Sequence, residues 1–374
     1  MPTLTPDLEI LGLIATQYAS ETHASPGPDI DKTYVGALAR AHEFGGFDRV
    51  LIGYHSSQPD GFQVAAYAAQ QTSRLKFLLA HRPGFVAPTL AARQLASLDQ
   101  FSDGRLAVHI ISGGSDEEQQ RDGDFLSKAE RYARTDDYIT VLKKTWTSAA
   151  PFDHEGPYYR VKGAFAAVKP LQKPHIPIFF GGASDEAVEV AGRHAETYAF
   201  FGEPLEQARE QIAKVRASAA RQGRENRVRF SMSLRPILAA TEDAAWARAK
   251  QILEEAKALR ANGSSPNPFR PGSRSEAKGA QRLLEAAAGG AVRDSRLWTE
   301  IAALTGAQGN STSLVGTAEQ VAESLLAYYD LGVTTFLFRG FDPLEDAIDY
   351  GRHLLPLLRE AVARRERPSV VAAE

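Results

Sequence analysis

Side chains able to do chemistry follow several apolar segments of the chain, at the point where each segment ends. His55 comes after residues 49–54, and His81 with Arg82 comes after residues 75–80. Further polar residues at such ends are Gln17, Ser112, Ser115, Asp116, Arg235 and Arg339. If the apolar segments are parallel strands, these ends share one face, which is where such sheets bind ligands. Arginine and histidine with few carboxylates favour anions and uncharged rings there.

The sharpest local pattern is Gly181-Gly182-Ala183-Ser184, between the apolar residues 176–180 and a helical stretch at 185–194. Two glycines and a small hydroxyl residue at a helix start expose backbone N–H groups to an anion. The pattern predicts a phosphate site. Glycine-rich turns also occur simply because they let a helix pack on a strand.

Three histidines are candidates for the same face, at the ends of the expected strands. His55, His81 and His109 all lie near segment ends, although a core position is the commoner role for a residue such as His109. No H-x-H, H-E-x-x-H or G-x-S-x-G pattern occurs, and the chain has no cysteine. We therefore expect neither a metal site nor a serine or cysteine nucleophile.

Strand-like and helix-like segments alternate along the chain and must position these residues. We expect eight strand–helix units, with strands near 8–14, 49–54, 75–80, 106–111, 176–180, 197–201, 227–238 and 334–338. The paired helices are expected near 33–44, 61–71, 89–101, 128–147, 185–194, 204–222, 242–261 and 344–359. Eight such units predict an α/β fold, a (β/α)8 TIM barrel. An open doubly wound sheet is the alternative.

Two stretches interrupt this rhythm within what we expect to be a single domain over 1–374. Residues 148–173 are compatible with a β-hairpin. Residues 261–313, before the last strand, are rich in Pro, Gly, Ser and Asn around 262–274 and include a short helix near 280–288. We interpret the longer stretch as a mobile lid; a surface loop without function is the alternative.

Composition excludes several classes of partner. The chain has 43 Lys+Arg against 46 Asp+Glu, a formal charge of -3, which provides no field for nucleic acid or an anionic membrane. No segment approaches the ~18 apolar residues of a membrane span, and the N-terminus lacks the basic region of a signal peptide. We expect a soluble, cytoplasmic protein.

Several long motifs together resemble the bacterial luciferase-like flavin monooxygenases, particularly the alkanesulfonate monooxygenase branch. They are LKFLLAHRPGFVAPTLAARQLASLDQFSDGRLAVHIISGG, GDFLSKAERYARTDDYI, PIFFGGASDEA, TSLVGTAEQV and FLFRGFDPLEDAI. The resemblance implies an α/β barrel that takes reduced FMN from a separate NAD(P)H-dependent reductase and uses O2 to oxidise a small organic molecule. It also implies a homodimer or homotetramer and a mobile active-site segment before the last strand.

The same resemblance implies site residues. Ser184, the Gly182 and Ala183 amides beside Gly181, and Tyr132 would hold the FMN phosphate. The residues implied along the ribityl chain and ring are Asp60, Ala80, His81, His109, Ile111 and Ser112. His55, His81, Arg82, Arg235 and Arg339 are the catalytic candidates, the arginines as partners of an anionic substrate.

The chain departs from the desulfonating pattern at four places. It has Ser233-Leu234-Arg235 where an Arg-x-His pair is expected, Phe341 for a Tyr, Gln58 for a Cys and Gln17 for a His. These departures leave FMN use intact. An alkanesulfonate or other organosulfur compound is the expected substrate class, although the departures put a sulfonate in doubt. A deazaflavin-dependent oxidoreductase of the same fold and a non-catalytic flavin-binding protein are the alternatives.

Overall fold

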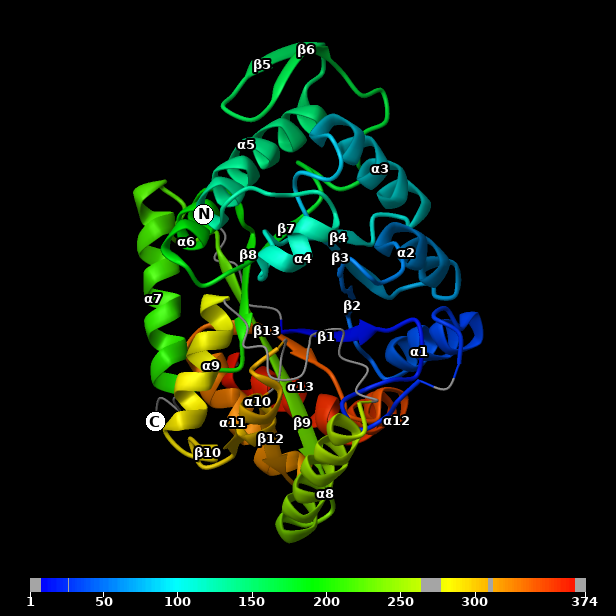
Figure 1. Cartoon of the computed structure of the whole chain (residues 1–374), viewed down its shortest axis with the longest axis vertical. Helices are drawn as coiled ribbons and strands as arrows, with labels where there is room; N and C mark the ends of the chain where they lie inside the picture. The colour runs from blue at the N-terminus through cyan, green and yellow to red at the C-terminus, as the bar shows by residue number, and fades with distance from the viewer. Residues whose placement is uncertain (1–7, 26, 264–276, 309–311, 367–374) are drawn as a thin grey trace, which may run out of the picture.

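Eight parallel strands close into a barrel in the computed structural model, which describes residues 8–25, 27–263, 277–308 and 312–366. Their bounds are β1 Glu9–Ile14, β2 Arg49–Ile52, β3 Lys76–His81, β4 Leu106–Ile110, β7 Ile178–Gly181, β8 Thr197–Phe201, β9 Arg229–Leu238 and β13 Val333–Phe338. The ring closes because β13 pairs with both β9 and β1, as Figure 1 shows. The TIM-barrel prediction is confirmed, and the open sheet is excluded.

Side chains on each strand alternate between the barrel interior and the surrounding helices. On β3, Leu78 packs inside with Leu11 and Leu337, whereas Phe77 and Leu79 belong to the larger core beneath the helices. Both faces of the sheet are therefore apolar, which is typical of parallel strands. The interior group consists of Leu11, Leu51, Leu78, Ala107, Phe179 and Leu337 and closes the barrel below the mouth.

Most strands are followed by the helix that the sequence predicted. The bounds are α1 Lys32–Phe44, α2 Gly61–Gln70, α3 Pro88–Phe101, α5 Lys128–Thr147, α6 Asp185–His194 and α7 Leu205–Arg221. The last strand leads to α12 Pro343–Asp349, a π-helical turn Tyr350–Leu354 and α13 Leu355–Glu366. A short helix, α4 Asp116–Arg121, precedes α5. In the first interruption, β5 Phe152–Glu155 and β6 Arg160–Ala164 form the expected antiparallel hairpin at the edge of the molecule (Figure 1).

The helix predicted to cover strand seven was assigned to the wrong segment. α8 Glu242–Ala261 packs on β12 Ser313–Gly316 and the far half of β9, in a second apolar cluster with Ile252, Trp298 and Val315. The helix that covers the barrel here is α11 Ala318–Asp330, which contacts α7, α13 and β13. Periodicity identifies an amphipathic helix but not the surface that it covers.

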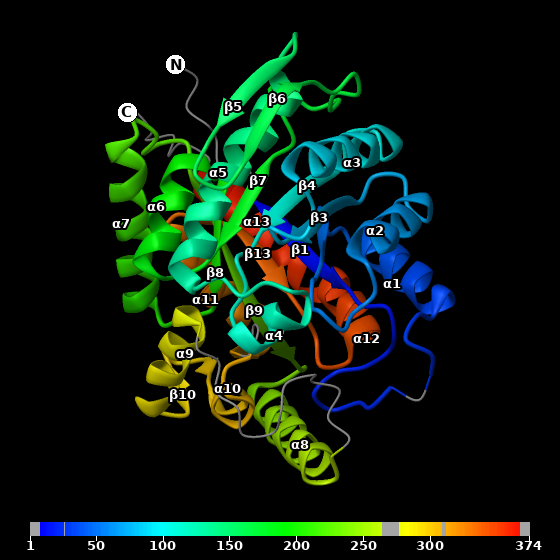
Figure 2. The same cartoon turned by 45° about the horizontal axis from the view of Figure 1, so that its top comes forward.

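The second interruption is therefore a structured extension. It contains α9 Lys278–Ala288, near the expected short helix, a small hairpin of β10 Val292–Arg293 and β11 Leu297–Trp298, and α10 Glu300–Thr305. Figure 2 shows α8, α9 and α10 grouped at one end of the barrel. The predicted mobile loop at 262–274 lies mostly outside the described residues, as does the segment 309–311.

Strand β9 belongs to both the barrel and the extension. Its first half pairs with β8 and β13, and residues 235–238 pair with β12. Ser233 O accepts a hydrogen bond from Gly202 N, and Arg235 N donates one to Thr312 O. The pairing of this edge of β9 therefore passes from β8 to β12 between residues 233 and 235. The hydroxyl of Thr312 donates to Gly202 O at 2.6 Å and closes the junction.

Candidate functional site

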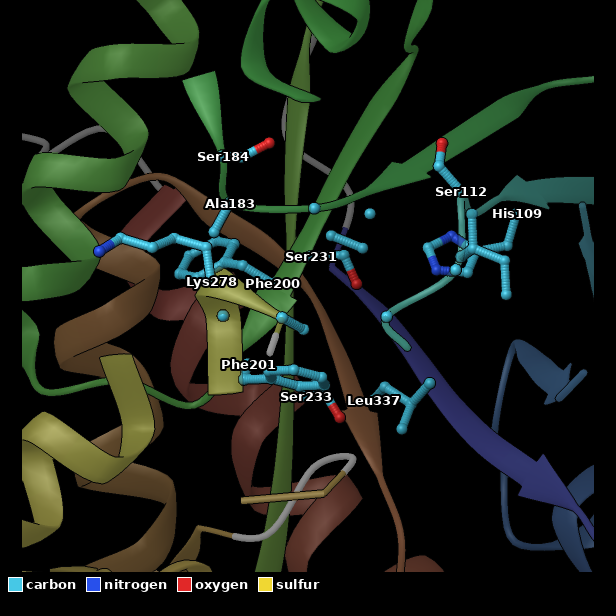
Figure 3. Close-up of a pocket in the computed structure, with 18 of the residues that line it drawn as sticks. His109, Ser112, Ala183, Ser184, Phe200, Phe201, Ser231, Ser233, Lys278 and Leu337 are labelled. Carbon is cyan, nitrogen blue, oxygen red and sulfur yellow. The ribbon is translucent and has the colours of Figure 1, made fainter. Parts of the chain in front are cut away.

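A cavity of about 300 Å³ lies in the barrel mouth. Leu11, Leu51, Leu78 and Leu337 form its apolar base, which we call the leucine floor. Nine predicted residues line it: Arg82, His109, Ile111, Ser112, Tyr132, Gly181, Gly182, Ala183 and Ser184. In Figure 3, Ala183 and Ser184 lie on one side and His109 and Ser112 on the other. The volume is at the lower end of the range for small-molecule sites, about 300–1,000 Å³.

The turn between β7 and α6 has the features of an anion site. Gly182 has φ +139°, and a Cβ there would lie 2.7 Å from the Tyr132 hydroxyl, so only glycine fits. Tyr198 donates to Gly182 O at 2.5 Å and fixes the turn. Ser184 is the N-cap of α6, at the positive end of the helix. The backbone of residues 182–184 and the two hydroxyls therefore surround one corner of the cavity.

Tyr132 is positioned by the start of α5. Ser127 and Glu130 form a reciprocal capping box there, which fixes the first turn of the helix. The Tyr132 side chain is buried against Phe180 and reaches Gly182 from the helix layer. Burial raises the pKa of Tyr132, while its hydrogen-bond interaction with Ser184 opposes that rise. The hydroxyl is thus protonated and a donor at neutral pH.

His109, on β4, is a neutral member of the lining. A Cβ on Gly181 would lie 3.1 Å from its Cε1 and Nε2, so the ring packs against the glycine turn. Burial lowers the pKa of His109 to about 4. Its Nδ1 is buried without a hydrogen-bond partner among the described residues, and a bound polar group would satisfy it.

Several lining residues were not predicted as site residues, although Ser233 was noted at a position that matches the family's site. Ser231 and Ser233 project inward from β9, and Phe200 and Phe201 border the cavity from β8 (Figure 3). Lys128 from α5 and Lys278 from α9 add two cations to the lining. The sequence could have predicted that the two serines share one face of a strand, because they alternate with apolar residues in RFSMSLRP.

A buried ion pair attaches the extension to this cavity. Arg282 on α9 donates to both oxygens of Glu203, from Nε at 2.8 Å and Nη2 at 2.6 Å. Glu203 lines the cavity, and its side chain is 1% exposed. Burial raises the pKa of Glu203, and the guanidinium opposes this. The pair holds α9 against the loop after β8.

A second cavity of about 380 Å³ lies at the ends of β1, β2 and β13. Its lining includes the predicted residues His55 and Arg339, together with Gln17 and Gln58. Leu13 and Gly53 line it, two residues beyond Leu11 and Leu51 of the leucine floor. Since residues two apart share a strand face, the cavities follow one another along β1 and β2.

The three arginines predicted to bind an anionic substrate already have carboxylate partners. Arg235 is completely buried, and its Nη1 lies 2.7 Å from Glu21 Oε2. Nη1 of Arg339 lies 3.6 Å from Glu21 Oε1. Arg235 also donates to Gly340 O at 2.9 Å and stacks over Phe341. Arg235 lines neither cavity, so with Glu21 as its partner we expect no direct contact between its guanidinium and a substrate.

Arg82 is paired in the same way. It donates to Glu118 Oε2 at 2.7 Å and lies over the Tyr54 ring, 4.5 Å from its centre. His55 Nε2 is 3.6 Å from the other Glu118 oxygen, and burial lowers the pKa of His55. Glu118, on α4, was not anticipated from the sequence.

Three other predicted residues line neither cavity. His81 points into the helix layer, where its Nε2 is 2.6 Å from the Tyr138 hydroxyl, because it alternates with the inward-facing Ala80 on β3. Asp60 is the exposed N-cap of α2 and accepts from Gln63 N at 3.1 Å. Ala80 itself is buried beside His109 in the sheet.

The described residues contain no group of three or more His, Asp or Glu side chains arranged to hold a metal ion. No helix among them is both long and apolar enough to cross a membrane.

Comparisons with known proteins concern the family and the fold of the chain. The family model for luciferase-like monooxygenases matches residues 9–335. A riboflavin lyase solved with modified FMN and riboflavin is 22% identical, with a TM-score of 0.78 over 95% of this chain and 92% of that chain. EDTA monooxygenase from Chelativorans sp. BNC1 is 19% identical, with a TM-score of 0.75 over 95% and 94%.

The fold also serves a different cofactor. An F420-dependent secondary alcohol dehydrogenase, solved with an F420–acetone adduct, is 17% identical, with a TM-score of 0.68 over 94% of this chain and 99% of that chain. These identities show the fold alone, whereas the family model covers most of the sequence. The chain therefore belongs to the luciferase-like monooxygenase family, whose members are flavin-dependent monooxygenases.

Proposed function

We propose that the protein is the oxygenase of a two-component system, which receives reduced FMN from an NAD(P)H-dependent reductase and uses O2 to oxidise a small organic molecule. The observation that carries the proposal is the Gly182 turn beneath the Tyr132 hydroxyl, at the edge of a cavity with an apolar base. One end of that cavity suits a phosphate, and the other suits a flat apolar ring.

The lining fits the parts of FMN in order. Ser184, Tyr132 and the amides of the 182–184 turn would hold the phosphate, with Lys128 as a nearby cation. His109 and Ser112 would meet the ribityl hydroxyls, and the unpartnered Nδ1 of His109 is suited to such a contact. The ring would lie above the leucine floor. Bound reduced FMN supplies the electrons that activate O2.

The protein's own contribution is positioning and the exclusion of water. Leu11, Leu78 and Leu337 would present an apolar surface to the ring, and Phe200 and Phe201 border the cavity from β8. His109 stays neutral at pH 7 because its pKa is lowered to about 4, so it adds no charge to this apolar surrounding. The two inward serines of β9 add hydroxyl groups to the lining.

Cofactor titration tests the proposal. The protein should quench FMN fluorescence on binding, and Gly182→Ala should abolish binding, because the new Cβ would meet Tyr132 and the Ala187 Cβ. Gly27→Ala is the matched control, since a Cβ there meets nothing within 4 Å. Preferential binding of F420 would favour the deazaflavin-dependent alternative.

Turnover separates the remaining alternatives. With FMN, NADH and a flavin reductase, candidate substrates should increase O2 consumption and yield an oxygenated product. FMN binding without a product for any of a broad panel of small organic molecules would favour the non-catalytic flavin-binding alternative.

A further inference from the structure

The second cavity is the place where a substrate can lie beside the proposed flavin ring. Its wall includes Leu13 and Gly53, two residues beyond the leucine floor, and also Ile14, Ile52 and Val64. Its size, about 380 Å³, suits a small organic molecule. The chemistry of its wall therefore selects the substrate class.

One acidic residue, Glu21, lies in this wall as far as the chain is described. Its carboxylate lies between two guanidinium groups, 2.7 Å from Arg235 Nη1 and 3.6 Å from Arg339 Nη1. This is the position that the carboxylate or sulfonate of an anionic ligand would take. Burial alone would raise the pKa of Glu21, but the two guanidinium charges lower it to about 2, so the group is ionised at any ordinary pH.

The rest of the wall is apolar, polar and uncharged, or already paired. Leu13, Ile14, Ile52 and Val64 are among its apolar members. Thr16, Gln17, Ser20, Tyr54 and Gln58 offer hydroxyl and amide groups. His55 lies beside Glu118 and the Ser57 hydroxyl. An entering molecule meets hydrogen-bonding groups, and the arginine charges are turned toward Glu21.

We propose that Glu21 determines specificity by occupying the anion site that Arg235 and Arg339 would otherwise offer. The second cavity then accepts an uncharged, hydrogen-bonding organic molecule and rejects sulfonates and carboxylates. That the bound molecule is a substrate rests on the proposed oxygenase function, whereas the charge preference of the cavity does not.

Binding of two probes of nearly equal shape tests the proposal. Methanesulfonate is an anion, and methanesulfonamide is its neutral counterpart at pH 7. At constant ionic strength, Glu21→Gln should tighten methanesulfonate binding about ten-fold or more relative to the unmodified protein, and leave methanesulfonamide unchanged. Adding Arg339→Gln to this variant should remove the gain.

A charge-matched control and a folding control complete the experiment. Glu242→Gln removes an exposed carboxylate paired with Arg296, away from the cavity, and should give no gain. If Glu21→Gln is poorly folded, because Arg235 stays buried without a counter-charge, methanesulfonate should raise the unfolding temperature of Glu21→Ala. Methanesulfonate that binds the unmodified protein equally well, or that neither binds nor stabilises the variants, overturns the proposal.

These outcomes are distinguishable from a failure of the proposed function. The methanesulfonate titration, made without flavin, measures binding in the second cavity, and the FMN titration measures binding in the first. A protein that binds no FMN but gains the anion site on loss of Glu21 would refute the oxygenase and retain the selectivity.

Discussion

The hydroxyl of Tyr138 on α5 lies 2.6 Å from Nε2 of His81 on β3, in the layer between the barrel and its helices. Both side chains are buried, and the His81 ring also meets the edge of Phe62. The pair joins strand to helix outside the cavities. His81, predicted as a site residue, lines neither cavity, and we expect a structural role for it.

Replacing His81 with Leu should lower the free energy of unfolding by about 1–3 kcal/mol, because the Tyr138 hydroxyl would be left buried without its partner. FMN affinity should not change. Urea denaturation and FMN titration of the same variant check this. Weaker FMN binding at an unchanged free energy of unfolding would show that His81 acts in flavin binding.

Stability should fall on mild acidification. Burial lowers the pKa values of His42, His81 and His109 to about 4, from 6.5 in the unfolded chain. Between pH 4 and pH 6.5 the three histidines are protonated in the unfolded chain and neutral in the folded protein. The free energy of unfolding should therefore decrease by up to about 1.4 kcal/mol per pH unit per histidine as pH falls from 6.5 toward 4.

Urea unfolding at pH 7.5 and pH 5 measures that loss. His42→Gln should reduce the difference between the two pH values, because one of the three groups is gone. His353→Gln, at an exposed position, should not. Equal stability at both pH values would contradict the assignment of three buried neutral histidines.

The phosphate site should distinguish FMN from riboflavin. Tyr132→Phe combined with Ser184→Ala should weaken FMN binding by about 1–3 kcal/mol, the usual cost of lost hydrogen bonds to a charged group. Riboflavin, which has no phosphate, should bind the variant and the unmodified protein alike. Tyr67→Phe, whose hydroxyl donates to Lys32 O far from the cavity, is the control. An equal loss for both flavins would place the phosphate elsewhere.

Removing one partner of the ion pair between Arg282 and Glu203 should strongly lower the free energy of unfolding. Arg282→Met leaves Glu203 buried and charged, and should lower the free energy of unfolding by about 3–5 kcal/mol. The double variant with Glu203→Gln should recover most of this loss. Urea denaturation of the four members of the cycle gives the coupling, and additive effects would show that the pair does not act as a unit.

The barrel was predictable because its strands are buried on both faces. Such strands appear as short, nearly continuous apolar runs, and RVLI and KFLLAH are recognisable without context. The glycine turn between β7 and α6 was predictable for a similar reason: two glycines and a serine between a strand and a helix have a local physical meaning. These parts of the structure depend on neighbours in sequence.

The parts that were missed depend on distant neighbours. α8 and α11 are both amphipathic, and only the pairing of the four-residue β12 with β9 decides which helix covers the barrel. Glu21 lies in an irregular loop with no periodic signal, and its role arises only when the fold brings it to Arg235. Charged side chains at strand ends show where a site is, but their partners decide what it binds.

The position of Arg235 in the sheet has a consequence for protein engineering. It lies where β9 changes from barrel to extension, and its guanidinium donates to the carbonyls of Arg339 and Gly340, just past the end of β13. The same guanidinium faces the Glu21 carboxylate. Selectivity and the attachment of β9 to the end of β13 therefore depend on one side chain. A redesign toward anionic substrates has to replace Glu21 and keep Arg235, whose guanidinium would then hold both the anion and the two carbonyls.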